Sequence, residues 1–212
     1  SYAGVLSNWH GNDNDKLQRL IGLISLLFLM AYASAQLVAG GKALHVLFDW
    51  PTWLGAAIGA LLVAAYCVAG GIRASIWTDA AQSTAMIVSM ALLFVVTINA
   101  LGGLNQTIAS MAEVDGFLDW FPKDLAFPGV AGGLLFAVSW LFAGLSVIGQ
   151  PHIMVRFMTL NDSGKMRNAK AWYYLWFTAF YCLATGVGML SRVYLAETGS
   201  FDAELALPTM AL

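Results

Sequence analysis

The segment GVAGGLLFAVSWLFAGLSVIGQPH, residues 129–152, contains no Asp, Glu, Lys or Arg. It is long enough to cross a bilayer, which takes about 20 apolar residues. Its second half nevertheless gathers Gly144, Gly149 and Pro151, which weaken a helix, and proline also removes a backbone donor. Membranes tolerate freed backbone groups only where protein or water satisfies them. The segment predicts either a helix interrupted for contact with a solute or ion, or a simple proline kink at the cytoplasmic end of the span.

The composition is that of a membrane protein. The chain has 212 residues, of which 59% are hydrophobic and 10% are charged, whereas soluble domains carry about 25% charged residues. This balance excludes an ordinary soluble globule, a disordered chain and a disulfide scaffold. With 10 basic against 12 acidic residues, there is no positive field to attract phosphates, so no nucleic acid is expected as a partner. The expected partner is the lipid bilayer.

Runs without charged residues predict five transmembrane helices, and they leave no room for a soluble domain. Residues 1–212 are interpreted as one transmembrane domain, a fragment of a longer polypeptide whose missing helices would be its partners, because the chain begins with Ser1 and shows no signal peptide. An outer loop is predicted at 102–128 and an inner loop at 150–170. The predicted spans are about 20–44, 52–72, 79–101, 129–149 and 171–194.

The placement of lysine and arginine predicts the orientation, because cytoplasmic loops carry an excess of both. Alternate connections divide the ten positive charges into sets of seven and three, and the larger set is predicted to be cytoplasmic. The location is therefore a cell membrane crossed several times, with the bacterial inner membrane preferred. The cytoplasmic set is Lys16, Arg19, Arg73, Arg156, Lys165, Arg167 and Lys170, and the outer set is Lys42, Lys123 and Arg192.

Glycine is frequent, with 21 residues, and two patterns of it carry structural predictions. Pairs at the ends of predicted spans are expected to terminate helices, since glycine adopts a positive φ without strain. Steps of the form GxxxG are expected to let two helix backbones approach closely. The terminating pairs are Gly40–Gly41, Gly70–Gly71 and Gly102–Gly103, and the steps are Gly55 with Gly59 and Gly129 with Gly133.

Few polar residues lie within the spans, so each has two interpretations. Tyr32 and Gln36 are four residues apart and share one face of the first span. They would either bond to a neighbouring helix or line a solute pathway. Asp79 is predicted at the start of the third span, where a carboxylate complements the helix dipole or binds a small cation. Thr78 and Gln82 are placed to add oxygen ligands.

No enzyme is predicted. The three histidines are far apart in the sequence and form no HExxH pattern, and neither a GxSxG motif nor a phosphate-binding glycine loop is present. A polytopic membrane enzyme needs clustered histidines or carboxylates, and none cluster in this sequence.

Three stretches resemble the sodium:solute symporter family and, within it, the sodium/proline symporters. They are AYASAQLVAGGK at 31–42, GGIRASIWTDAAQ at 70–82 and GQPHIMVRFM at 149–158. The second and third are fairly specific, because each joins a helix boundary to charged and aromatic residues in order. The similarity runs from about Lys16 to Leu195.

The resemblance implies an all-α membrane fold, a partial inverted-repeat bundle like that of the leucine transporter. The implied activity is sodium-coupled import of a small organic solute, with proline or a related amino acid as the best guess, by alternating access. The sodium ion would be co-transported, with Asp79 and, more weakly, Thr78 as ligands. The implied solute-facing residues are Tyr32, Gln36, Trp140, Gly144 and Ser146.

The resemblance is incomplete at two places. Ala143 and Val147 stand where the proline symporters carry Trp and Tyr, so the solute pocket is expected to differ. The principal sodium site of the family is built from helices that this chain does not include. Two other functions fit the same sequence: a transporter-like sensor module of a histidine kinase, and a structural or channel-forming bundle.

Overall fold

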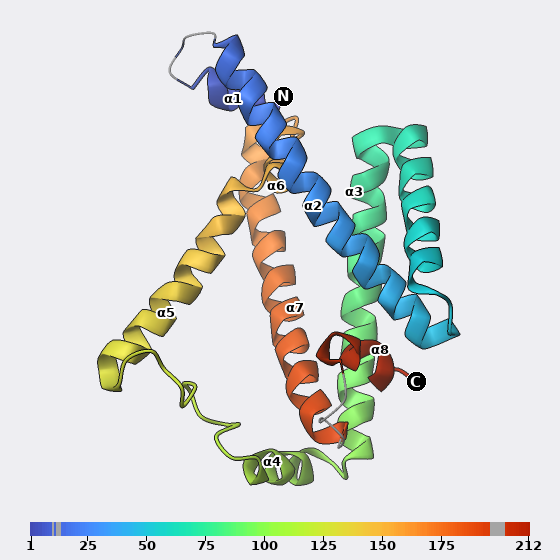
Figure 1. Ribbon diagram of the computed structural model, residues 1–212, viewed down its shortest axis with the longest axis vertical. Coiled ribbons are helices and arrows are strands. Elements are labelled where there is room, and N and C mark those ends of the chain that lie inside the picture. The colour runs from blue at the N-terminus through green and yellow to red at the C-terminus, as the bar shows by residue number, and fades with distance from the viewer. Residues whose placement is uncertain (10, 12–13, 196–201) are drawn as a thin grey trace. The chain divides into compact units, whose positions relative to one another are not determined.

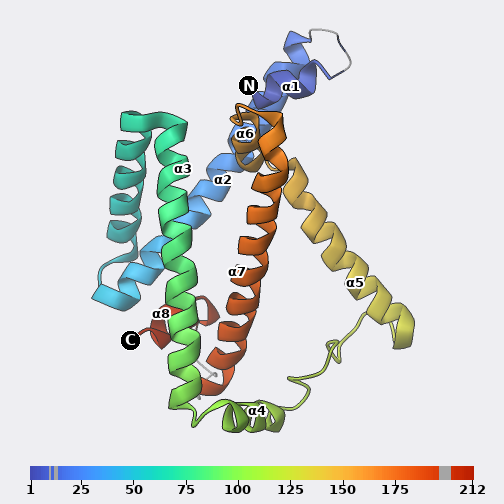
Figure 2. The same cartoon turned by 180° about the vertical axis from the view of Figure 1, so that it is seen from behind.

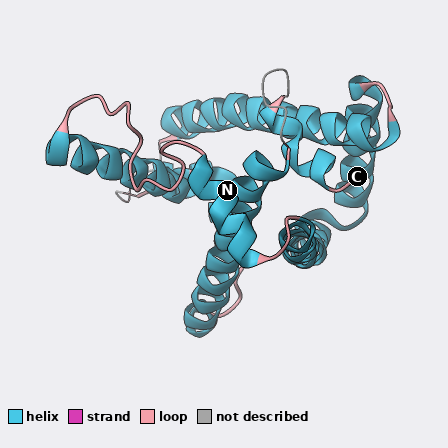
Figure 3. Cartoon of the chain, turned by 90° about the horizontal axis from the view of Figure 1, so that it is seen from below, coloured by secondary structure: helices cyan, strands magenta, loops and turns pink. Residues whose placement is uncertain are grey.

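The computed structural model describes residues 1–9, 11, 14–195 and 202–212, and this part of the chain contains helices and loops but no strand (Figure 3). The all-α architecture predicted from the sequence is confirmed. The α-helices are α1 (Tyr2–Ser7), α2 (Asp15–Phe48), α3 (Thr52–Ala100), α4 (Leu104–Glu113), α5 (Gly129–Leu145), α6 (Pro151–Met158), α7 (Met166–Tyr194) and α8 (Ala206–Met210); the 3-10 turns are η1 (Ser146–Gly149), η2 (Ser163–Lys165) and η3 (Ala203–Leu205).

The chain divides into two compact units. Unit 1 comprises Ser1–Met30 with Val114–Met166, and unit 2 comprises Ala31–Glu113 with Arg167–Leu212. Within the described residues, three helical stretches are long and apolar enough to cross a membrane: Asp15–Phe48, Thr52–Ala100 and Ser163–Tyr194. The shorter α5 is also apolar. Its 17 residues extend about 26 Å at the usual helical rise, close to the thickness of a bilayer core.

Helix α3 is two helices joined by a tight turn. Gly71 interrupts it with φ 55° and ψ −145°, and the two arms run side by side in opposite directions (Figures 1 and 2). The predicted termination at Gly70–Gly71 is therefore confirmed. The pair Gly102–Gly103 likewise follows the end of α3 with φ of 88° and 97°. Two of the predicted membrane spans thus lie within one long helical stretch.

The prediction that Gly40–Gly41 ends a helix is wrong, because α2 continues to Phe48. Both glycines are helical there, and Gly41 serves close packing instead. A Cβ on Gly41 would lie only 2.3 Å from the backbone oxygen of Thr52, and one on Gly55 would lie 3.0 Å from the Cα of Gly41. The first predicted GxxxG step, through Gly55, therefore does bring two helix backbones together in unit 2.

The second GxxxG step packs differently from the prediction. A Cβ on Gly133 would lie 3.4 Å from the ring of Phe121, which belongs to the loop before α5. At the neighbouring Gly132 a Cβ would clash with the backbone oxygen of Phe127. These glycines make room for the loop that precedes their own helix rather than for a second helix.

The buried apolar side chains of the described part all lie in unit 2. Four of them lie on the second arm of α3, α7 and α8, and the fifth, Met111, lies on α4. Gly186 of α7 allows the ring of Phe94 to approach within 2.7 Å of its Cβ position. Many other large apolar side chains are exposed along α2, α3 and α5, as suits helices that face lipid or other helices. The buried set is Met90, Met111, Val187, Leu190 and Met210.

The fourth predicted span is interrupted, at its end rather than at its middle. Helix α5 stops at Leu145, residues 146–149 form the 3-10 turn η1, and Gln150 is extended with φ −76° and ψ 118°. Pro151 is the first residue of α6, a position where its missing N–H costs nothing. The α-helix thus ends before Pro151, so the proline alone does not account for the interruption.

Gly71→Ala should destabilise the protein, because its φ and ψ are tolerated at little cost by glycine alone. The expected loss is about 1–3 kcal/mol, the usual cost of a residue held in a sparsely populated backbone region. Thermal unfolding of the purified protein in detergent, followed by tryptophan fluorescence, measures the loss.

Gly40→Ala is the matched control. Gly40 is helical and has open space around a Cβ, so this change should leave the unfolding temperature unchanged or raise it. Equal destabilisation by the two variants would contradict the role assigned to the turn at Gly71.

Candidate functional site

Tyr32 and Gln36 lie on α2, in the part of that helix that belongs to unit 2. They are one helical turn apart and face the same way, as their spacing predicts. Both side chains are exposed, and half of the Tyr32 surface is accessible. Both side chains are thus accessible on the face they share.

Thr78 and Asp79 lie inside the second arm of α3, seven and eight positions after Gly71. The arm continues through Arg73 to the turn, so Asp79 is not at the helix start, contrary to the sequence-based expectation. A helix accommodates charged and polar residues near a membrane surface, so an apolar run marks the lipid boundary and not the helix end. Asp79 is therefore too far from the helix N-terminus for the dipole interpretation to apply.

The hydroxyl of Thr78 is oriented by its own helix. Its Oγ1 lies 3.0 Å from the carbonyl oxygen of Ala74 and 2.9 Å from that of Ser75, and it donates its proton there. Since the proton is engaged, the oxygen lone pairs remain available to accept or coordinate. Thr78 and Asp79 are both partly buried, so this stretch offers a hydroxyl and a carboxylate in neighbouring positions.

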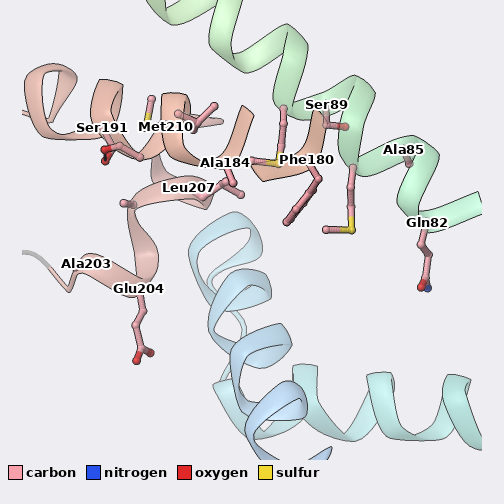
Figure 4. A pocket seen from close by; sticks show the side chains of 15 residues that line it. Gln82, Ala85, Ser89, Phe180, Ala184, Ser191, Ala203, Glu204, Leu207 and Met210 are labelled. Atoms are coloured by element: carbon pink, nitrogen blue, oxygen red, sulfur yellow. Dashed lines mark hydrogen bonds between the residues drawn. The ribbon is translucent and has the colours of Figure 1, made fainter. Parts of the chain in front are cut away.

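Gln82, one turn beyond Asp79, lines a cavity of about 800 Å³ in unit 2 (Figure 4). The cavity lies between the second arm of α3, α7 and the η3–α8 segment. Its walls are mainly apolar, with three methionines, and the serines of the two long helices add hydroxyls. The lining residues are Gln82, Ala85, Met86, Ser89, Met90, Phe180, Ala184, Val187, Gly188, Ser191, Ala203, Glu204, Ala206, Leu207 and Met210.

The helix interruption in unit 1 begins at Ser146, and Trp140 and Gly144 precede it on α5. The Trp140 ring is two-thirds exposed and meets Phe136 edge to face, with centroids 6.3 Å apart. Gly144 has open space where a Cβ would be. Ser146 opens η1, and its hydroxyl donates to the carbonyl oxygen of Ala143 at 2.6 Å. An aromatic face, an open backbone and a hydroxyl oxygen thus follow one another along this end of α5.

One backbone group of the interruption has a side-chain partner that sequence reasoning missed. The phenol of Tyr2 donates a hydrogen bond to the carbonyl oxygen of Gly149 at 3.1 Å. This contact ties α1 to the turn between α5 and α6, and all three belong to unit 1. The two residues are 147 positions apart, and no local pattern in the sequence connects them.

Helix α6, which follows the interruption, carries its positive charge on Arg156. Burial lowers the pKa of His152 below its ordinary value, and the neighbouring guanidinium of Arg156 lowers it further. His152 is therefore neutral at neutral pH, and its ring adds no second positive charge at the start of α6.

A second long-range contact was also missed. Lys42, near the outer end of α2, forms ion pairs with Asp202 and Glu204 of the η3 turn. The sequence offered one signal, an acidic stretch following the fifth predicted span, but pairing it with Lys42 needed the structure.

The predicted site residues therefore fall into two groups. Unit 2 holds Tyr32, Gln36, Thr78 and Asp79, and unit 1 holds Trp140, Gly144 and Ser146. In the described ranges, no three His, Cys, Asp or Glu side chains are grouped to hold a metal ion.

The sequence is similar to one known family and to several curated proteins. The sodium:solute symporter family matches residues 5–208. The high-affinity proline transporter PutP of Bacillus subtilis is 31% identical over 87% of this chain and 38% of its own length. The sodium/proline symporter of Haemophilus influenzae is 28% identical over 88% of the chain and 36% of its own length. The sodium/pantothenate symporter of the same organism is 32% identical over 70% of the chain and 31% of its own length.

No solved structure matches the chain significantly. The chain spans about a third of the length of these curated relatives. The family match, by contrast, covers nearly all of the chain, including the turn at Gly71 and the interruption before Pro151. The chain belongs to the sodium:solute symporter family.

Proposed function

We propose that this chain is part of a sodium-coupled symporter that imports a small organic solute, with proline or a related amino acid preferred. The observation that carries the proposal is the interruption at residues 146–150, within an otherwise apolar membrane segment of a family member. Interrupted helices in transporters present backbone groups to substrate or ion, and alternating access exposes such a site to each side in turn. Two relatives, one named as a proline transporter and one as a sodium/proline symporter, support the choice of solute.

The same proposal includes the topology. Five crossings are assigned to α2, the two arms of α3, α5 with η1, and α7. In unit 2, the turn between the arms of α3 and the start of α7 lie at one end, and the ends of α3 and α7 lie at the other (Figures 1 and 2). This supports the assignment of the Gly71 turn and the start of α7 to one side of the membrane, which the positive charges assign to the cytoplasm.

Sodium is proposed to bind near Asp79. The carboxylate supplies charge, Thr78 supplies a hydroxyl oxygen whose proton already bonds to the helix backbone, and Gln82 supplies an amide oxygen one turn away. Oxygen ligands of this kind suit a hard cation. Because Gln82 also lines the cavity, an ion held here would lie beside that cavity.

Trp140, Gly144 and Ser146 of unit 1 are proposed to contact the solute, and the resemblance to the family assigns the same role to Tyr32 and Gln36 of unit 2. The open backbone at Gly144 lets a ligand approach closely, and the Ser146 oxygen can accept a hydrogen bond from a solute ammonium. The exposed Trp140 ring offers a flat face. Its π electrons attract a cation, and its apolar surface can pack against an aliphatic ring of the solute. Ala143 and Val147 enlarge this region relative to the proline symporter pattern, so a somewhat larger solute also fits the proposal.

The competing functions differ in whether solute flux depends on sodium. A channel or structural bundle would show no coupling of solute flux to sodium. The sensor-module alternative has no support among the relatives, which are named as transporters. A panel of radiolabelled proline, pantothenate and other small solutes, assayed with and without a sodium gradient, separates these outcomes.

In the full-length protein, Asp79→Asn should raise the sodium concentration needed for half-maximal uptake by about tenfold or more. The change removes the charge of the ligand, and a contact to a charged group contributes about 1.5–3 kcal/mol. Uptake of labelled solute into proteoliposomes at a series of sodium concentrations measures the shift.

Asp162→Asn is its control, because the same chemical change falls on an exposed inner-loop residue. There, Oδ1 accepts from the backbone N–H of Gly164, a bond that asparagine can also accept. Asp162→Asn should leave sodium dependence unchanged. An identical sodium dependence in Asp79→Asn and wild type would remove the ion role of Asp79.

Cysteine protection tests the solute site. In a background with Cys67→Ser and Cys182→Ser, since both native thiols are exposed, Tyr32→Cys and Trp140→Cys should each be labelled more slowly when solute and sodium are present. Leu141→Cys is the control, because Leu141 is 61% exposed but about 100° around α5 from Trp140. Labelling of Tyr32→Cys and Trp140→Cys that solute does not slow, or slows no more than that of Leu141→Cys, would mean that both residues serve packing.

A further inference from the structure

The turn before α6 contains a backbone carbonyl that is released from the helical hydrogen-bond pattern. In a continuous α-helix the amide of Ile153 would donate to the carbonyl oxygen of Gly149. Here the amides of Ile153 and Met154 both donate to the carbonyl oxygen of Gln150, each at 3.1 Å. The Gly149 oxygen accepts instead from the phenol of Tyr2, also at 3.1 Å. A side chain from a segment distant in sequence thus replaces the missing helical bond.

Helix α1, which carries Tyr2, is held on two sides within unit 1. It packs against α6, and the side chain of Ser1 caps its start by accepting from the backbone N–H of Gly4. A Cβ on Gly4 would lie 3.5 Å from Nε2 of Gln18, so α1 also lies against the start of α2. The six residues of α1 are too few to form a stable helix alone, so its place depends on these contacts. Tyr2 therefore reaches the turn from a segment that is anchored on both α2 and α6.

The bond to Gly149 acts on the part of unit 1 that carries the proposed solute contacts. Ser146 opens η1, three residues before Gly149, and Gly144 lies in the last turn of α5. Inside the turn, the amide of Gln150 donates to the carbonyl oxygen of Val147 at 3.2 Å, the upper end of the usual range for such a bond. The turn thus has weak internal support. Holding the Gly149 carbonyl therefore limits rotation of the peptide units that follow Ser146.

We propose that Tyr2 is a positioning residue, whose phenol fixes the turn at residues 146–150 in the geometry in which the end of α5 binds solute. The proposal rests on the proposed function, which assigns Gly144 and Ser146 to the solute. Tyr2 itself need not contact the solute, because it acts through the Gly149 carbonyl. The bond is accessible to water, so it favours this geometry by about two- to tenfold and does not lock it.

Hydrogen exchange of the backbone amides tests the contact directly. In the full-length protein in proteoliposomes, Tyr2→Phe keeps the ring and removes only the donor. The amides of Gln150 and Ile153, whose bonds define the turn, should exchange about two- to tenfold faster, because the turn opens more often. Para-aminophenylalanine at position 2 offers an N–H donor at the same place and should restore the slow exchange. Mass spectrometry of a peptide covering residues 146–154 measures the rate.

Uptake of radiolabelled proline at saturating sodium tests the functional role. Tyr2→Phe should raise the KM for proline about two- to tenfold and leave kcat nearly unchanged, because a turn that is less often in the binding geometry weakens apparent affinity in proportion. A change that merely loosened the fold would instead reduce the number of active molecules, and so lower kcat without raising KM. Para-aminophenylalanine at position 2 should restore the KM.

Tyr174→Phe is the matched control. Tyr174 lies on α7 in unit 2, is 65% exposed, and its hydroxyl makes no hydrogen bond within the described part of the chain. Its loss should change neither exchange at residues 146–154 nor the KM. Exchange that ignores Tyr2→Phe would overturn the proposal. An equal response to Tyr174→Phe, or a failure of para-aminophenylalanine to restore exchange and KM, would overturn it as well.

The two measurements separate this proposal from the proposed function. Faster exchange in Tyr2→Phe with an unchanged KM for sodium-dependent proline uptake would refute the positioning role and leave the symporter intact. Absence of sodium-dependent proline uptake by the unsubstituted protein would overturn the preferred form of the proposed function. The positioning role would fall with it, even if exchange at the turn still followed Tyr2.

Discussion

The structure depends on one constraint: inside a bilayer every backbone N–H and C=O must find a partner within the protein. Helices α2, α3 and α7 meet this demand internally over most of their length. The exception is the stretch from Ser146 to Gln150, where the α-helix gives way to a 3-10 turn and then to extended backbone. One carbonyl freed there, that of Gly149, is satisfied by the phenol of Tyr2. The interruption is thus supported by the protein rather than merely tolerated.

Three glycine pairs show why a dipeptide alone does not decide local structure. Gly70–Gly71 forms a turn and Gly102–Gly103 follows a helix end, whereas Gly40–Gly41 remains helical. The difference at Gly41 is the backbone of Thr52, which approaches so closely that no side chain fits. Glycine permits both a positive φ and a close approach. Whether a glycine adopts a positive φ or permits a close approach depends on a neighbouring segment that the local sequence does not identify.

The features predicted correctly from the sequence are those with local causes. Charge-free runs locate the apolar helices, and Gly144, Gly149 and Pro151 locate the interruption to within a few residues. The features missed are distant in sequence: Tyr2 with Gly149 and Lys42 with Glu204 are 147 and 162 positions apart. The placement of Asp79 inside a helix was missed for another reason, because hydropathy reports where lipid begins and not where a helix does.

The kinds of contact in this chain differ in how easily they can be broken. The approach of Gly41 to Thr52 and Gly55 is a packed backbone contact, and separating it would open a void along two helices. The Lys42 ion pairs and the Tyr2 hydrogen bond are single polar contacts between exposed groups, for which water can substitute. In the proposed transport cycle, the glycine contact keeps the helix pair together as a rigid body, while the polar contacts of Lys42 and Tyr2 are exchanged for water as each conformation forms.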